Sequence, residues 1–204
     1  MSIAIQQLGL WGHEQPSIDS TFATARPMTL ADGAWVDYVP DWVRGHETLM
    51  ADVVASTKWQ SERREMYERM VDVPRLLASI PRDGSEHPLF GHMRQELARR
   101  YAIELPSVTL ALYRDGRDSV AFHGDRVARE LPEAIVATVS LGEPRRFLLR
   151  RKSGGESRAF SLGWGDLLVM GGTCQRTWQH GIPKVAHAGP RMVIMFRPSW
   201  YEEP

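Results

Sequence analysis

The chain has 204 residues, of which 43% are hydrophobic and 25% are charged, as in ordinary globular domains. Its 25 Lys and Arg residues balance its 25 Asp and Glu residues, which excludes binding to polyanions or membranes through overall charge alone. The single cysteine, Cys174, excludes an internal disulfide framework and indicates a reducing compartment. The sequence shows no signal peptide and no apolar run of membrane-spanning length, so we expect a cytoplasmic, monomeric protein that does not enter membranes.

The first half of the chain is predicted to contain helices. Residues 47–56 have a helical pattern, and a second helix is indicated by Leu89, Met93, Leu97 and Tyr101, which recur every four residues. Side chains at this spacing share one helix face, so we expect these four to pack in the core.

The second half is predicted to be rich in β-strands. Short apolar runs separated by Gly, Pro, Asp and Ser occur at 107–113, 119–123, 134–141, 145–151, 158–162, 166–170 and 191–196. Such a series favours an antiparallel sandwich or barrel, such as a jelly roll. We therefore expect a mostly β protein in which an α/β N-terminal extension (1–102) packs on a β core (103–204) within one integrated domain.

A His-x-Asp pair, His123 and Asp125, ends the second of these runs. Residues two apart in a strand point the same way, so both side chains can face a barrel mouth. His180, which lies 57 residues further on after the run DLLVM, is the candidate third ligand. Two imidazoles and one carboxylate leave metal positions open, as in non-haem Fe(II) oxygenases. The alternatives are a solvated polar pair and a structural zinc site, which would need four protein ligands.

Two arginines in the last run, Arg191 and Arg197, are six residues apart and therefore share one strand face with Val193 and Met195. Guanidinium groups on an inward face need anions to pair with them, and a dicarboxylate co-substrate would supply these anions. Tyr113 could donate its hydroxyl to the same anion. Internal salt bridges or solvent exposure for the arginines, and simple packing for the tyrosine, remain open as alternatives.

Four segments in this order resemble the AlkB family of Fe(II) and 2-oxoglutarate (2OG) dependent dioxygenases. They are ALYRDGRDSVAFHGD, VATVSLGEPRRFLLR, LGWGDLLVMGGTCQRTWQHGIPK and RMVIMFR, and the resemblance runs from about residue 107 to residue 198. A further segment, VDVPRLLASI (71–80), resembles the stretch before the family's nucleotide-recognition region. The resemblance implies a double-stranded β-helix, which is a jelly-roll core.

The resemblance also implies roles for individual residues. His123, Asp125 and His180 would hold Fe(II) as the catalytic metal set, while Arg191 and Tyr113 would bind 2OG and Arg197 would lie near the iron-binding Asp and the substrate. With O2 as the second co-substrate, such an enzyme oxidises an N-alkyl group on a base in DNA or RNA, so that an aldehyde leaves and the base is repaired. The target base would be flipped out of its strand.

Several positions differ from the usual family pattern. Ala111 replaces the Asn of Asn-x-Tyr, Val193 and Met195 replace the Asn and Thr between the two arginines, and Arg126 follows the metal motif where acidic residues are common. We therefore expect fewer hydrogen bonds to 2OG, and the sequence does not define the alkylated base. These differences leave open a relative that acts on RNA, protein or a small molecule, and a non-catalytic nucleic-acid-binding relative.

Other residues could contact nucleic acid. The basic stretches RRFLLRRK (145–152), ERREMYERM (62–70) and ELARRY (96–101) could follow a phosphate backbone or be solvated surface. Similarly, Trp164 and Trp178 could stack on a base or pack in the core.

Overall fold

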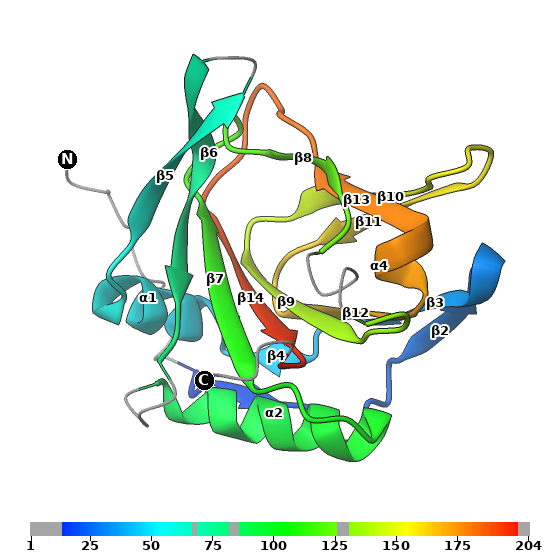
Figure 1. Ribbon diagram of the computed structural model, residues 1–204. Coiled ribbons are helices and arrows are strands. Elements are labelled where there is room, and N and C mark those ends of the chain that lie inside the picture. The colour runs from blue at the N-terminus through cyan, green and yellow to red at the C-terminus, as the bar shows by residue number, and fades with distance from the viewer. Residues whose placement is uncertain (1–13, 67–68, 82–85, 126–130, 200–204) are drawn as a thin grey trace, which may run out of the picture.

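The computed structural model describes residues 14–66, 69–81, 86–125 and 131–199, with the backbone alone at 62–66 and 69–74. Over this part of the chain, the larger sheet is antiparallel and contains eight strands (Figure 1). In spatial order they are β2 (Arg26–Thr29), β3 (Ala34–Val39), β12 (Asp166–Gly172), β9 (Val136–Gly142), β14 (Arg191–Arg197), β7 (Ser107–Tyr113), β6 (Arg69–Ser79) and β5 (Gln60–Met66).

A smaller antiparallel sheet lies opposite the middle of the larger one. Its described strands are, in order, β11 (Ser157–Leu162), β10 (Arg145–Arg151), β13 (Trp178–Ile182) and β8 (Val120–His123). A third pairing joins β1 (Ser17–Ile18) to β4 (Val43–Arg44). The two larger sheets face each other across the interior of the protein (Figure 1).

Helices cover the outer face of the large sheet. The two covering helices are α1 (His46–Ser56) and α2 (Pro88–Tyr101). Two shorter helical turns lie elsewhere, at η1 (Ala31–Gly33) and α4 (Cys174–Thr177). In α2, Met93 and Leu97 are fully buried, and Leu89 and Tyr101 are partly buried against the same core. The predicted helix face is thereby confirmed, as is the helix predicted at 47–56.

In the central strands of the large sheet both faces are buried, and their alternation assigns each side chain to one of two cores. In β14, Met192, Ile194 and Phe196 pack under the helices, whereas Val193 and Met195 face the interior between the sheets. This alternation follows from the two-residue period of a strand. The same interior face of β14 carries both arginines singled out from the sequence.

All seven predicted runs form strands, and the mostly β, jelly-roll type of fold is confirmed. Two features were not expected from the sequence. Strands of the first hundred residues continue the large sheet, since β3 pairs with β12 and β6 pairs with β7. His180 lies within a strand, β13, that was not among the seven predicted runs. No helix in the described part of the chain is long and apolar enough to span a bilayer.

Candidate active site

His123, Asp125 and His180 meet at the inner surface of the small sheet. His123 ends β8 and is the register partner of His180 in β13, and their ring centroids are 4.3 Å apart. Asp125 follows β8 directly, and its Oδ1 lies 3.7 Å from Nε2 of each histidine. One donor atom from each residue lies within 4.8 Å of the other two, so the three could hold one metal ion.

Each histidine can direct a nitrogen lone pair at the cluster. Nδ1 of His123 lies 2.9 Å from the Ala121 carbonyl oxygen, and donating a proton there leaves the Nε2 lone pair directed at the cluster. Burial lowers the pKa of His180 to about 4. At neutral pH the His180 imidazole is therefore uncharged and has a lone pair to offer.

Asp125 is held ionised although it is buried. Burial alone would raise the pKa of Asp125, but Arg197 and His180 favour the charged form and hold the pKa at about 2. Arg197 donates from Nε to Oδ2 of Asp125 at 2.8 Å and from Nη1 to the Thr109 hydroxyl at 2.5 Å. Oδ1 of Asp125 is thus left to face the two histidines.

Gln175 and Gly124 also position the carboxylate, and neither was singled out from the sequence. The side-chain carbonyl of the buried Gln175 accepts a hydrogen bond from the Asp125 backbone N–H at 2.9 Å. Gly124, between the two ligands, packs closely on α4. A Cβ at this position would overlap the backbone carbonyl oxygen of Gln175. The small residue between His123 and Asp125 was the only sequence signal for this contact.

Arg191 is fully buried at the other end of β14. It donates from Nη2 to the Ser140 hydroxyl at 2.9 Å and from Nε to the Leu162 carbonyl at 3.3 Å, while Nη1 has no partner among the described residues. Burial lowers the pKa of Arg191 to about 10, which leaves it charged at neutral pH. Its guanidinium carbon is 5.2 Å from the ring centroid of Tyr113. A buried cation with an unused donor is suited to an anionic ligand.

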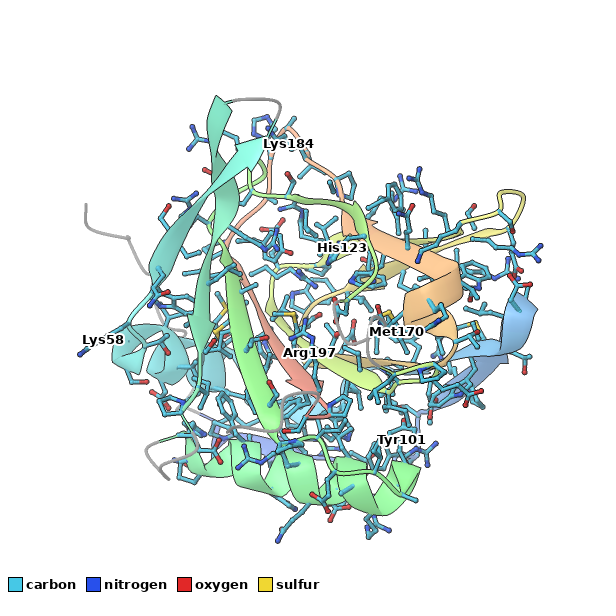
Figure 2. All side chains as sticks on the ribbon, in the orientation of Figure 1. Lys58, Tyr101, His123, Met170, Lys184 and Arg197 are labelled. Carbon is cyan, nitrogen blue, oxygen red and sulfur yellow. The ribbon has the colours of Figure 1, made fainter. Side chains whose placement is uncertain are left out.

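The metal cluster and Arg191 line the same cavity of about 500 Å³. Figure 2 shows His123 at β8 and Arg197 at β14, on opposite sides of the interior between the sheets. Tyr113 lines this cavity as well, as do three of the residues that depart from the family pattern, Ala111, Val193 and Met195.

A comparison with protein-family models identifies the chain's family. The model described as "2OG-Fe(II) oxygenase superfamily" matches residues 42–197, which is most of the sequence. The chain belongs to this superfamily. Curated relatives named as AlkB homologues confirm the resemblance to the AlkB branch.

The relatives of this superfamily member are distant. It is 28% identical over 151 residues to the alpha-ketoglutarate-dependent dioxygenase alkB homolog 3 of Bos taurus, which covers 69% of this chain and 50% of the relative. It is 33% identical over 115 residues to the DNA oxidative demethylase ALKBH2 of Arabidopsis thaliana, covering 45% and 37% of the two chains. The chain spans about half the length, or less, of these curated relatives.

Solved structures show the same fold as this oxygenase. A 2OG-Fe(II) oxygenase family oxidoreductase from Burkholderia pseudomallei aligns with a TM-score of 0.56 and 14% identity, over 79% of this chain and 84% of the other. The structure titled "The structure of OsALKBH1" aligns with a TM-score of 0.60 and 13% identity, over 85% and 100%.

The residues present fit the cofactors of the superfamily, which are Fe(II), 2OG and O2. Fe(II) accepts neutral imidazole and carboxylate ligands, and these are the protonation states that the environments of His180 and Asp125 favour. The unpartnered Nη1 of Arg191 offers a donor for a carboxylate of 2OG. The expected cofactor set is therefore confirmed.

The remaining sequence candidates lie in different places. Arg145 is not on a solvated strand face, as the basic stretch 145–152 had suggested, but is buried and donates to the carbonyls of Asp115, Asp118 and Pro183. Trp178 is fully buried in the core, and the exposed Trp164 does not line the cavity. The side chains of 62–70 and all of Arg126 lie outside the described residues.

Proposed function

We propose that this protein is an Fe(II) and 2OG dependent dioxygenase that removes N-alkyl groups from bases in DNA or RNA. The observation that carries the proposal is that the two carboxylate oxygens of Asp125 have different partners. One carboxylate oxygen faces two imidazoles and the other is held by Arg197, in the same cavity as the partly unpaired Arg191.

In this proposal His123, Asp125 and His180 hold the iron, and Arg191 with Tyr113 binds the far carboxylate of 2OG. When bound, these cofactors with O2 supply the oxidation of an alkyl carbon, after which the hydroxylated group leaves as an aldehyde. The protein keeps Asp125 ionised through Arg197, keeps His180 neutral through burial, and encloses the reacting groups between two sheets.

A nucleic-acid substrate is supported by the names of the relatives, which include a DNA oxidative demethylase, and by the shape of the site. The metal cluster lies inside a cavity, so a base could reach it only by leaving its stack. The segment 71–80 contributes β6, which forms part of the cavity wall. We propose that this strand contacts the flipped nucleotide, and that residues 1–102 complete the site built by 103–204.

The test is turnover on matched substrates. Purified protein with Fe(II), 2OG and O2 is given single-stranded DNA, RNA or free nucleosides that carry the same N-methylated base, and both succinate and formaldehyde are measured. The proposal predicts equal amounts of both products, dependent on the DNA or RNA and lost in His123→Ala. Succinate without formaldehyde from any of the three would contradict a base dealkylase and point to a protein or small-molecule substrate.

A further inference from the structure

The two histidines of the metal cluster are held in different ways. His123 has a partner for the ring nitrogen that faces away from the cluster, since its Nδ1 lies 2.9 Å from the Ala121 carbonyl oxygen. His180 directs Nε2 toward Oδ1 of Asp125 at 3.7 Å, but within the described part of the chain its Nδ1 has no hydrogen-bond partner. Metal-binding histidines are usually oriented by a hydrogen bond at the second nitrogen. A different contact is therefore needed to fix the plane of the His180 ring.

The side chain of Phe147 makes such a contact. Its ring lies nearly parallel to the His180 imidazole, with an interplanar angle of 14° and a distance of 5.3 Å between the ring centroids. Offset stacking is a preferred arrangement of aromatic rings, and it depends on their relative orientation. Leu149 of β10 is the register partner of His180 in β13, and Phe147 lies two residues earlier on the same strand face. Such diagonal neighbours are within reach of aromatic side chains, so the strand pairing itself brings the two rings together.

Phe147 is itself held firmly by its surroundings. The residue is only 4% exposed and belongs to the core between the two sheets. Its register partner in β11 is Phe160, whose ring packs against that of Tyr38 with 5.8 Å between the centroids. Side chains in a close-packed core sit in defined rotamers. The Phe147 ring can therefore act as a fixed support behind His180.

We propose that Phe147 is a positioning residue for the metal site, and that its ring holds the His180 imidazole in the plane in which Nε2 faces Asp125 and the metal. Phe147 offers no metal ligand of its own and acts through His180. A ligand that is already oriented loses less conformational freedom when the metal binds, which for one side chain corresponds to roughly threefold to tenfold in affinity. The proposal rests on the proposed function, because it takes the His123, Asp125 and His180 cluster as the metal site.

The experiment compares two matched variants. Phe147→Leu keeps an apolar side chain but removes the ring that stacks on His180. Phe160→Leu makes the same change at the facing residue, whose ring packs on Tyr38 instead. Mn(II) affinity is measured by electron paramagnetic resonance of the free ion, without 2OG, because Phe147 also lines the cavity in which 2OG would bind. We expect the affinity to fall by about threefold to tenfold in Phe147→Leu and to stay near the wild-type value in Phe160→Leu.

A second measurement reports on the ring geometry, which a general loss of packing would not change selectively. The ring current of Phe147 should displace the proton NMR signals of the His180 ring in the metal-free protein. This displacement should be present in the wild type and in Phe160→Leu and should be lost in Phe147→Leu. The signals are assigned by their absence in His180→Asn. Thermal unfolding checks the fold of each variant, and Phe147→Met, which is also apolar and has no ring, replaces Phe147→Leu if that variant does not fold.

Three outcomes would overturn the inference. Phe147→Leu could bind Mn(II) as tightly as the wild type while its His180 signals move, which would show that the stacked ring has no effect on the metal site. Both leucine variants could lose affinity equally, which would make the effect one of core packing alone. A folded wild-type protein that binds no Mn(II) would remove the metal site of the proposed function and this inference together, whereas either of the first two results would overturn the inference alone.

Discussion

Arg197 and Asp125 form the ion pair on which the metal cluster depends. Nε of Arg197 donates to Oδ2 of Asp125 at 2.8 Å, and the pair is nearly buried, with side-chain exposures of 12% and 6%. The Arg197 side chain crosses the cavity from β14, the central strand of the large sheet, to a loop at the edge of the small sheet. It thereby links the two sheets at the point where the ligands meet.

Removing this guanidinium should make metal binding more sensitive to acid. In Arg197→Met, burial is opposed by fewer charges, so the pKa of Asp125 rises and protons compete with the metal. We expect Mn(II) affinity to fall by about tenfold or more at pH 6 and by less at pH 8. Electron paramagnetic resonance of free Mn(II) measures this, and Thr109→Val, which removes the other Arg197 contact, should have a smaller effect. A pH profile equal to that of the wild type would refute the role of the pair.

The protein without metal should lose stability as the pH falls below neutrality. The pKa of His180 is about 4 in the fold against an ordinary value of 6.5, so the unfolded chain takes up a proton first. The contribution of neutral His180 to the free energy of unfolding is fully present above pH 6.5 and is lost as the pH falls toward 4. The total loss is on the order of 3 kcal/mol. Urea unfolding with a chelator present measures it.

His180→Asn is the matched control for this pH effect, because its side chain does not titrate. Its free energy of unfolding should change less between pH 6.5 and pH 4 than that of the wild type. Parallel curves for the two proteins would show that other groups cause the loss.

Gly124→Ala should damage the metal cluster through the backbone. The added Cβ would overlap the backbone carbonyl oxygen of Gln175. Moving the loop away would strain the hydrogen bond between the Asp125 backbone N–H and the Gln175 side chain. We expect a loss of roughly 1 to 3 kcal/mol in stability and weaker Mn(II) binding. Gly91→Ala is the control for glycine replacement, because Gly91 has no positive φ and the nearest atom to an added Cβ there lies 4.0 Å away. Unchanged Mn(II) affinity in Gly124→Ala would show that the loop tolerates displacement.

Arg191→Met should lower the affinity for 2OG without unfolding the protein. The variant removes a charge-assisted contact worth roughly 2 kcal/mol or more, which is about 30-fold in affinity. It also removes a buried charge whose Nη1 is unpartnered, so the stability of the ligand-free protein should change little. Calorimetric titration of 2OG with Mn(II) present gives the affinity.

Arg145→Met is the comparison for that experiment, because Arg145 is also buried but donates to three backbone carbonyls. It should destabilise the fold more than Arg191→Met and change 2OG affinity less. The reverse ranking of the two variants for 2OG would move the carboxylate contact away from Arg191.

The thiol of Cys174 should resist modification in the folded protein. Burial raises the pKa of Cys174 to about 12, with a smaller contribution from the charge of Asp125, and only the thiolate reacts. A disulfide reagent should therefore label it only when the chain is unfolded in guanidinium. Rapid labelling of the native protein would show that α4 opens away from the metal cluster.

The sequence predicted those parts of the fold and site that follow from local periodicity. Alternation placed Arg191 and Arg197 on one face of a strand, and the His-x-Asp spacing placed two donors together. It did not predict Gln175 or Gly124, because their roles come from the packing of α4 against a loop fifty residues away. It also missed Arg145, since a basic residue in a basic stretch gives no local sign of being buried.

The positions of the strands in the α/β first half were not predicted for a related reason. β6 is interrupted by Pro74 and β5 is rich in charged residues, so neither has the apolar alternation that indicates a strand. The pairing of β5 with β6, and of β6 with β7, supplies the missing order. Tertiary pairing, rather than local preference, therefore builds the part of the cavity wall that β6 forms.

The most direct test of the site is an anaerobic titration of Fe(II) and 2OG into the metal-free protein. A keto acid chelated to Fe(II) in an open three-ligand site gives a visible charge-transfer band, and we expect this band in the wild type. It should be lost in Asp125→Ala and should need much more 2OG in Arg191→Met. A protein that shows no band while correctly folded would contradict the assignment of His123, Asp125 and His180 as the iron site.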